Sequence, residues 1–252
     1  MKKKIVLSGC SGKMGHAVAA LVRERQDCEI CAGIDLVSAG NEGFPVYASV
    51  KDFPGGADVL VDFSHPSLLP SLLEYGQSSM LPLVLCTTGY SKEQVAAVHE
   101  AAARIPIFYS GNMSLGINLL IELSKRAAQV LGPGFDIEIV EKHHNQKIDA
   151  PSGTALMLAD AVSQVEPEEM HYMYDRHSQR KKREKNEIGI HSVRGGTIVG
   201  EHEVIFAGHH EVITLSHSAQ SKEVFAAGAV NAAVFLSTQV PGLYSMPDLL
   251  KE

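Results

Sequence analysis

The first hundred residues alternate between short apolar runs and longer segments in which apolar side chains recur with helical spacing. In Met14–Arg25 the apolar residues fall at positions 14, 17, 18, 21 and 22, the spacing of an amphipathic helix. Helices are also expected at about Pro66–Tyr75 and Ser91–Arg104. The intervening runs predict buried strands at Lys3–Leu7, Ile30–Ile34, Val59–Val61, Leu83–Leu85 and from Ile105 onward. Strands that alternate with helices indicate an α/β domain with a parallel sheet and right-handed crossovers.

The pattern changes after Asn112. A long helix is expected over Leu115–Leu131, ended by Gly-Pro-Gly. Strand-like runs follow at Asp136–Glu141, Ile188–Val193, Thr197–Phe206 and Glu211–Ser216, and an Ala-rich helix over Lys222–Gln239 comes last. Successive strands favour a mixed or antiparallel sheet, and so a second domain of α+β type. We expect a first domain of residues 1–113 plus 226–252 and a second of residues 114–225.

The composition is that of an ordinary globular protein. Of 252 residues, 45% are hydrophobic and 20% are charged, and the net charge of -7 gives no general attraction to nucleic acid or membranes. The apolar run Ile5–Leu7 is too short for a signal peptide, and no run approaches the ~20 apolar residues of a membrane span. We therefore expect a cytoplasmic protein. Cys28 and Cys31 form a lone Cys-x-x-Cys within a predicted strand, which favours packing thiols over a redox or metal pair.

One strongly basic segment stands out against this background. Residues 176–187 (RHSQRKKREKNE) hold six Lys or Arg within ten positions. The segment has no interleaved aromatic residues and no basic helical face, which nucleic-acid surfaces usually show. A solvated loop between strands is therefore favoured over a nucleic-acid site.

A glycine-rich turn follows the first predicted strand and precedes the first helix. In GCSGKMG the glycines are Gly9, Gly12 and Gly15. Such a turn brings backbone N–H groups and the positive end of a helix dipole to a pyrophosphate, as in Rossmann-type dinucleotide-binding domains. Asp35 ends the second strand, where a carboxylate accepts hydrogen bonds from ribose hydroxyls. A structural turn without a ligand is the alternative. Because no Arg follows Asp35, we expect NADH to serve at least as well as NADPH, although Lys13 could offset this preference.

Two further polar loops follow predicted strands, CTTGY at 86–90 and SGNMSLG at 110–116. Ligands of open α/β sheets bind beyond the carboxyl ends of the strands. Thr87, Thr88 and Asn112 are therefore candidates to contact a nicotinamide and its ribose, although small polar loop residues are also common without a function.

Basic side chains gather at the end of the strand that begins at Asp136. His143, His144 and Lys147 lie within five residues, and residues 151–154 (Pro-Ser-Gly-Thr) resemble the start of a helix. A helix N-terminus beside cationic side chains suits a substrate that carries carboxylates, and Lys147 or a histidine could donate a proton. Structural histidines are an alternative. A metal site is less favoured, because no zinc-binding motif is present.

The segment EKHHNQKIDAPSGTA at 141–155 resembles the signature of the 4-hydroxy-tetrahydrodipicolinate (dihydrodipicolinate) reductases of bacterial lysine and diaminopimelate synthesis. It matches the family pattern E-x-H-H-x-x-K-x-D-x-P-S-G-T-A at every defined position. Other motifs of the family occur in order along nearly the whole chain: GCSGKMG, VDFSHP, TTGY, GNMSLGIN, IGIHSVRGG, VGEHEVIF and GLYSMPDLL. The resemblance implies a Rossmann domain that binds NADH and/or NADPH, and a C-terminal domain that binds a cyclic dicarboxylate and builds a homotetramer.

The resemblance also implies roles for individual residues. His143 corresponds to the family's proton donor/acceptor and Lys147 to its proton donor, and the substrate-binding positions are His144, Gly153 and Thr154. The cofactor positions are Gly9, Cys10, Ser11, Gly12, Lys13, Met14, Asp35, Cys86, Thr87, Thr88, Ser110, Gly111, Asn112 and Met113. Cys86 stands where many members have Gly, and a backbone contact to the cofactor would survive that change.

Two other functions compete with this one. A dehydrogenase of an aspartate-derived aldehyde would need a reactive thiol beside the nicotinamide, for which Cys86 is the conceivable candidate. A non-catalytic NAD(P)H-sensing regulator would instead bind nucleic acid through residues 176–187, with a steep dependence on salt.

Overall fold

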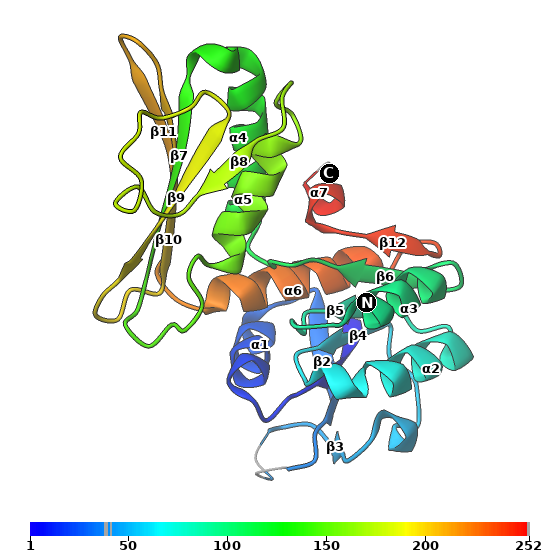
Figure 1. The fold of residues 1–252 in the computed structure, drawn as a ribbon. Helices are drawn as coiled ribbons and strands as arrows, with labels where there is room; N and C mark the ends of the chain where they lie inside the picture. Colours follow the sequence, from blue (N-terminus) through cyan, green and yellow to red (C-terminus); the bar gives the residue numbers. More distant parts are fainter. Residues whose placement is uncertain (38–39, 41, 251–252) are drawn as a thin grey trace. The chain divides into compact units, whose positions relative to one another are not determined.

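The computed structural model describes residues 1–37, 40 and 42–250, and the chain divides into two compact units. The first consists of Met1–Leu115 and Lys222–Glu252, and the second of Gly116–Ser221. The chain thus leaves the first unit once and returns to it with its last segment, which is drawn in orange and red in Figure 1.

The described part of the first unit is built on a seven-stranded parallel sheet with the order β12-β6-β5-β4-β1-β2-β3. Its strands are β1 (Lys3–Ser8), β2 (Cys28–Ile34), β3 (Val46–Tyr47), β4 (Val59–Asp62), β5 (Leu83–Leu85), β6 (Pro106–Tyr109) and β12 (Gly242–Tyr244). Its helices are α1 (Lys13–Glu24), α2 (Leu69–Ser79), α3 (Lys92–Ala102), α6 (Glu223–Leu236) and α7 (Met246–Leu249), with 3-10 turns at Val50–Asp52 and Pro66–Leu68.

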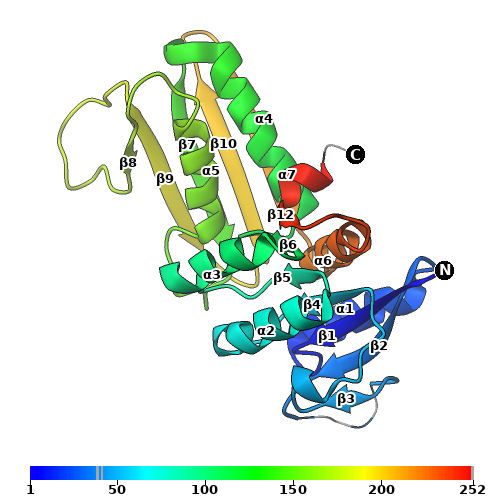
Figure 2. The ribbon, with the colours of Figure 1, turned by 90° about the vertical axis from the view of Figure 1, so that its right-hand side faces the viewer.

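Helices cover both faces of this sheet (Figures 1 and 2). Apolar side chains of α1 and α6 form one core with the sheet, and those of α2 and α3 form a second core on the opposite face. The chain runs from β1 to one edge through β2 and returns to β4 on the other side of β1. Such a reversal of strand order is where open α/β sheets bind ligands, at the carboxyl ends of the strands.

The second unit has a five-stranded mixed sheet in its described residues, with the order β11-β10-β7-β9-β8. Its strands are β7 (Asp136–His143), β8 (His171–Met173), β9 (Glu187–Arg194), β10 (Gly200–Ala207) and β11 (Val212–Ala219), and its helices are α4 (Leu115–Leu131) and α5 (Gly153–Ser163), with a 3-10 turn at Gly132–Gly134. β10 is antiparallel to both β7 and β11, whereas β9 is parallel to both β7 and β8.

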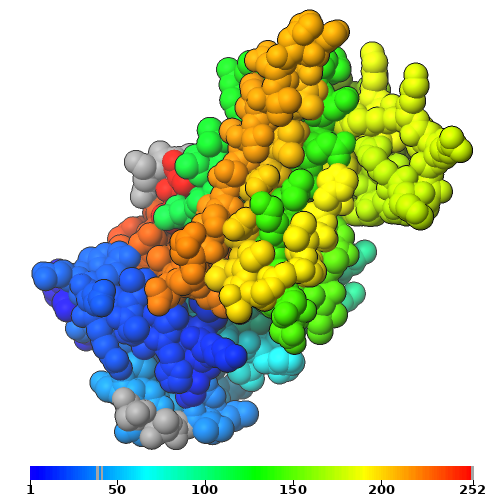
Figure 3. Space-filling view, turned by 90° about the vertical axis from the view of Figure 1, so that its left-hand side faces the viewer, coloured from blue at the N-terminus to red at the C-terminus, as the bar shows by residue number. Residues whose placement is uncertain are grey.

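Both helices of the second unit lie on one face of its sheet (Figure 1). Side chains along β10 alternate accordingly: Val204 and Phe206 are buried in the core with α4 and α5, and Glu203 and Ile205 point to the opposite face. Figure 3 shows that opposite face without a covering helix. The sheet is therefore apolar toward its helices and mixed in character on its outer face.

The predicted fold class, a parallel Rossmann-type sheet followed by an α+β unit with a mixed sheet, is confirmed. The prediction missed β3, β8 and β12, because these strands of two or three residues carry no measurable periodicity and, unlike the equally short β5, contain no continuous aliphatic run. β10 was predicted to start at Thr197 but starts at Gly200, since residues before it form a turn in which Gly196 has a φ of +48° and accepts from Asn145 N.

Candidate functional site

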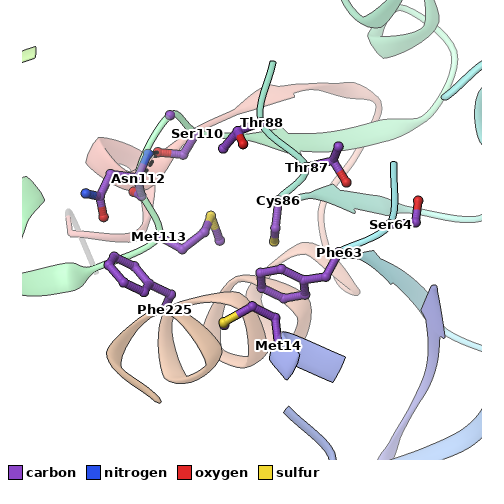
Figure 4. Close-up of a pocket in the computed structure, with 11 residues that line it drawn as sticks. Met14, Phe63, Ser64, Cys86, Thr87, Thr88, Ser110, Asn112, Met113 and Phe225 are labelled. Atoms are coloured by element: carbon purple, nitrogen blue, oxygen red, sulfur yellow. Dashed lines mark hydrogen bonds between the residues drawn. The ribbon is translucent and has the colours of Figure 1, made fainter. Parts of the chain in front are cut away.

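A cavity of about 390 Å³ lies in the first unit, beyond the carboxyl ends of its strands (Figure 4). Five side chains give it an apolar lining rich in sulfur and aromatic rings, and they come from α1, α6 and three loops: Met14, Phe63, Cys86, Met113 and Phe225. The polar lining residues are Ser64, Thr87, Thr88, Ser110, Gly111 and Asn112. An apolar recess with a few polar groups at its edge is typical of sites for flat organic ligands.

The glycine turn between β1 and α1 is close-packed. Gly9 has a φ of +77°, and a Cβ on Gly15 would come within 2.3 Å of the Gly9 carbonyl oxygen. The backbone N–H of Ser11 donates to Asp35 Oδ2 at 3.0 Å, and the Ser11 hydroxyl donates to the carbonyl of Val37 at 2.5 Å. The predicted turn and the predicted carboxylate are thus brought together. With α1 beginning directly behind them, this arrangement fits a pyrophosphate and a ribose.

A buried carboxylate fixes two of the cavity loops. Asp62, at the end of β4, accepts from the Thr87 hydroxyl at 2.7 Å and from both the N–H and the hydroxyl of Ser64, at 3.2 and 2.5 Å. The Asp62 carbonyl also accepts from Cys86 N at 2.9 Å. These hydrogen bonds therefore tie the loops that follow β4 and β5 to each other.

The third cavity loop is held by helix α6. A Cβ on Gly228 would come within 1.6 Å of the Met113 carbonyl oxygen, so this glycine allows the helix to lie directly against the loop. Within the loop, Ser110 donates to the Asn112 carbonyl at 2.9 Å and Ser114 N donates to Asn112 Oδ1 at 2.8 Å. The predicted positions Ser110, Gly111, Asn112 and Met113 accordingly line the cavity together.

The second unit contains a buried polar cluster of five residues, which we call the His143 cluster: Glu141, His143, Ser152, Arg194 and His202. Arg194 binds the Glu141 carboxylate with two nitrogens, at 2.7 and 2.8 Å. Glu141 Oε2 lies 2.6 Å from His143 Nδ1, and Glu141 Oε1 accepts from Ser152 N at 3.1 Å. The Ser152 hydroxyl caps α5 by accepting from Ala155 N, and it lies 3.0 Å from His202 Nε2.

Burial and charge set the ionisation of this cluster. Burial by itself raises the pKa of Glu141, but hydrogen bonds from Arg194, Ser192 and His143 outweigh it and hold the pKa at about 2. Burial lowers the pKa of His143, and the contact with Glu141 only partly opposes this effect. Burial, together with the neighbouring His143, lowers the pKa of His202 to about 4. At neutral pH the cluster therefore contains one carboxylate, one guanidinium and neutral imidazoles.

The remaining predicted substrate residues surround the start of α5. Gly153 and Thr154 form its first turn, and a Cβ on Gly153 would meet no atom within 4 Å, so the space in front of it is open. Lys147 Nζ pairs with the largely exposed Asp149 at 2.9 Å, and it is near enough to His143 to lower the pKa of that imidazole. His144 is half-buried in the same loop and its carbonyl accepts from Lys147 N.

The structure adds residues to which the sequence analysis gave no role. Phe63, Ser64 and Phe225 line the first-unit cavity, and Glu141, Arg194 and His202 belong to the His143 cluster. Glu141, Arg194 and His202 lie within motifs of the family signature, which was the available signal. Phe225 lies within the predicted Ala-rich helix, and no motif in the sequence marked it as a residue that lines a cavity.

The basic segment 176–187 is tied to carboxylates. Arg176 pairs with Glu138 and Glu187, and Arg183 pairs with Asp136 and Glu138 and donates to three backbone carbonyls. These arginines hold the loop to β7 and β9, which agrees with the interpretation as a structural loop. Among the described residues, no group of three or more His, Cys, Asp or Glu is placed to hold a metal ion, and no helix is long and apolar enough to cross a membrane.

Cys86 does not have the properties of a catalytic thiol. Burial and the charge of Asp62 raise its pKa well above the usual value, so that the thiol stays protonated. Since the thiolate is the nucleophilic form, the competing function with a reactive Cys86 is disfavoured. The other three cysteines are also free.

A Rossmann-type unit with a glycine turn and an apolar cavity beyond the carboxyl ends of its strands, joined to a second unit that holds the buried His143 cluster, is typical of oxidoreductases that use a pyridine nucleotide. Models of the N-terminal and C-terminal parts of dihydrodipicolinate reductase match residues 3–113 and 116–250. The chain belongs to the dihydrodipicolinate reductase family.

Individual relatives agree with this assignment. The chain is 56% identical, over 100% of both chains, to 4-hydroxy-tetrahydrodipicolinate reductase of Caldanaerobacter subterraneus subsp. tengcongensis. It is 50% identical to that of Clostridium tetani, over 98% of this chain and 96% of the relative. A solved structure of dipicolinate-bound dihydrodipicolinate reductase from Paenisporosarcina sp. TG-14 superposes with a TM-score of 0.81 at 25% identity, covering 97% of this chain and 98% of that one.

The lowered pKa of His202 predicts a pH-dependent stability. The unfolded chain binds a proton at this residue as the pH falls through about 6.5, whereas the folded chain binds it only near pH 4. The free energy of unfolding should therefore be at its full value above pH 6.5 and fall as the pH approaches 4, by on the order of 3 kcal/mol from this group. In His202→Gln this part of the decline should disappear, so that the free energy of unfolding depends less on pH.

Urea denaturation at a fixed protein concentration, at several pH values between 4 and 7.5, measures this difference. His99→Gln, at an exposed position on α3, is the matched control and should follow the unmodified chain. Parallel curves for His202→Gln and the unmodified chain would contradict the prediction.

Proposed function

We propose that this chain reduces 4-hydroxy-tetrahydrodipicolinate to tetrahydrodipicolinate with NADH or NADPH, in the synthesis of diaminopimelate and lysine. The observation that carries the proposal is the His143 cluster, set beside Lys147 and the open first turn of α5. Together these supply an anion-binding helix end and proton-exchanging side chains, which the reduction of a conjugated cyclic dicarboxylate requires. The high identity to curated reductases over the full chain supports the particular substrate.

The first unit would hold the cofactor. The backbone of Gly9, Cys10, Ser11, Gly12 and Lys13 would receive the pyrophosphate, and Asp35 would accept hydrogen bonds from the ribose hydroxyls. Met14, Cys86, Met113 and Phe225 provide an apolar floor for the nicotinamide ring, and Thr87, Thr88 and Asn112 provide polar groups at its edge. The bound reduced nicotinamide supplies the hydride.

The second unit would hold the substrate. Its two carboxylates suit the N–H groups of Gly153 and Thr154 at the start of α5 and the imidazole of His144. The relative from Paenisporosarcina sp. TG-14 was solved with dipicolinate, a planar cyclic dicarboxylate, which supports this class of ligand.

Protons are supplied and removed by Lys147 and His143. Loss of the C4 hydroxyl as water leaves a conjugated imine, hydride then adds to C4, and a proton adds to the neighbouring carbon. Lys147, or a water molecule that it orients, donates this proton, and its positive charge stabilises the electron density that develops on the ring. Because His143 is neutral at neutral pH, it is able to accept a proton while water is lost.

The assembly that we propose is a homotetramer formed through the second unit. The outer face of its sheet carries Val140, Ile205 and Thr214 at its centre, where Ile205 and Thr214 are cross-strand neighbours. Beside them, Lys142 pairs with both Glu201 and Glu203, so that one carboxylate charge remains in excess in this group. A cytoplasmic location is supported by the four free thiols, which suit a reducing compartment.

Replacement of Lys147 tests the proposed chemistry. With substrate made in situ from pyruvate and aspartate semialdehyde by the preceding synthase, the unmodified chain should oxidise NADH or NADPH. Lys147→Ala should lower kcat by ~10²–10³-fold with little change in cofactor Kd, because one preorganised charged group is lost. Lys125→Ala, which breaks a similar ion pair on α4, should keep full turnover. Near-normal turnover of Lys147→Ala would reject this residue as the acid, and no oxidation of either cofactor by the unmodified chain would reject the function.

The carboxylate of Asp35 predicts the cofactor preference. It repels a 2′-phosphate and has no adjacent Arg, so kcat/KM with NADH should equal or exceed that with NADPH. Asp35→Asn should shift the ratio toward NADPH by removing the repulsion while preserving an acceptor. The ratio of kcat/KM values for both cofactors measures this, and a preference of the unmodified chain for NADPH above tenfold would overturn the prediction.

The proposed interface predicts the oligomeric state. Sedimentation velocity should give a tetramer for the unmodified chain and for Ile205→Val. Ile205→Glu should dissociate it, because a buried unpaired carboxylate in the interface costs several kcal/mol for each copy. A monomeric unmodified chain, or an intact Ile205→Glu tetramer, would contradict this interface.

A further inference from the structure

The Glu141 carboxylate is hydrogen-bonded to three other residues of the His143 cluster. It is completely buried, and its two oxygens accept from both terminal nitrogens of Arg194, from Ser152 N and from His143 Nδ1. Because its pKa is about 2, it remains a carboxylate at any pH at which the enzyme works. A permanent acceptor at Nδ1 requires that Nδ1 carry a hydrogen.

The other ring nitrogen of His143 lies over a glycine. A Cβ on Gly200 would come within 3.1 Å of Nε2, so the absence of a side chain leaves room for this edge of the ring. The ring of His202 packs edge-on against His143, with centroids 5.2 Å apart. Glu141 thus holds the Nδ1 side of the His143 ring, and His202 packs against the ring. Nε2 lies on the side of the ring away from Glu141.

We propose that Glu141 and Arg194 are positioning residues that hold His143 in the tautomer protonated at Nδ1, so that Nε2 is the atom that exchanges the proton. This inference rests on the proposed role of His143 in the reduction. Neither Glu141 nor Arg194 is required to touch the substrate, and both act through the imidazole.

Arg194 has a second effect in this arrangement. A lone carboxylate 2.6 Å from Nδ1 would stabilise the imidazolium and keep His143 charged near neutral pH. Burial is the main cause that lowers the pKa of His143, and the bidentate guanidinium adds to it by balancing the carboxylate charge, so Glu141 orients the ring without making it a permanent cation. Arg194 is itself anchored by donating to the carbonyls of Val193 and Asp149, at 2.8 and 2.6 Å.

Four charged or titratable side chains surround His143, and they lie on three strands and one loop. They are Glu141 on its own strand, Arg194 on β9, His202 on β10 and Lys147 in the following loop. Arg194 and Lys147 favour the neutral ring, Glu141 favours the charged ring, and His202 is neutral at working pH. Removal of Glu141 or Arg194 should therefore move the titration of His143 in opposite directions.

The tautomer is tested without any substitution of the two positioning residues. Histidine labelled with ¹⁵N distinguishes a protonated ring nitrogen from an unprotonated one by chemical shift, and His143→Gln identifies the signals that belong to this residue. At pH 8 the unmodified enzyme should show Nδ1 protonated and Nε2 unprotonated. The reverse tautomer, or an equal mixture of both, would overturn the proposal. The measurement needs no substrate, so it stands even if the proposed reaction fails.

Two amide substitutions test the charge balance. Glu141→Gln should lower the pKa of His143 and reduce kcat by ~10²–10⁴-fold, as when other His–carboxylate pairs lose the carboxylate, with little change in cofactor Kd. Arg194→Gln should instead raise the pKa of His143, moving the acid limb of the kcat/KM profile to higher pH. Glu122→Gln, which removes a carboxylate from an ion pair on α4, is the control and should leave both profiles unchanged.

The double substitution Glu141→Gln/Arg194→Gln guards against misfolding, because it leaves no unpaired charge buried. It should restore folding if either single variant unfolds, yet retain the low kcat. Shifts of the His143 pKa in the same direction for both single variants, or a double variant with normal kcat, would show that the pair serves packing alone. A reaction that depends on Lys147 but is insensitive to Glu141 would leave the proposed function intact and reject only this inference.

Discussion

A carboxylate that is buried beneath a sheet must be given donors, and this requirement organises the second unit. Removing the Glu141 charge from water costs several kcal/mol unless hydrogen bonds and an opposite charge replace the solvent. The donors come from β9, from the residue that caps the start of α5 and from the neighbouring histidine on β7. The same contacts that compensate the charge therefore fix the end of β7 against the start of α5. His143, Gly153 and Thr154 acquire their relative positions in this way.

Asp62 has a similar function in the first unit. It lies at the end of a central strand, is completely buried, and accepts from residues in the loops after β4 and β5. A parallel sheet places the carboxyl ends of its strands along one edge, but it does not determine how the loops beyond them lie. Asp62 supplies that constraint for Ser64 and Thr87, and Gly228 supplies it for Met113 by admitting a helix to the loop. In each unit the sheet is regular, and a buried carboxylate or a close helix–loop contact fixes the loops beyond the ends of its strands.

The sequence was sufficient for features that depend on nearby residues. Helical spacing in α1, the glycine turn, the start of α5 at residues 151–154 and the basic run ending at Lys147 are all local patterns. The sequence could not show which distant residues contact them. Arg194 is 53 positions from Glu141, and Phe225 reaches the cavity from a helix at the other end of the chain. The basic segment 176–187 shows the same difficulty, because its charge was visible in the sequence but the carboxylates that bind Arg176 and Arg183 were not.

The charged groups of the second unit also divide into two kinds. Glu141 and Arg194 are locked together by paired hydrogen bonds, and neither changes its ionisation in the working pH range. Lys147 pairs instead with a carboxylate that is mostly exposed, a contact that solvent weakens and that a carboxylate of the proposed substrate would be able to replace. His143 is neutral because it is buried, yet it touches a fixed negative charge that would stabilise it once protonated. The proposed chemistry, in which the site both orients a ring and exchanges protons, needs this separation, because a group that is held firmly enough to orient its neighbour is held too firmly to release its own proton.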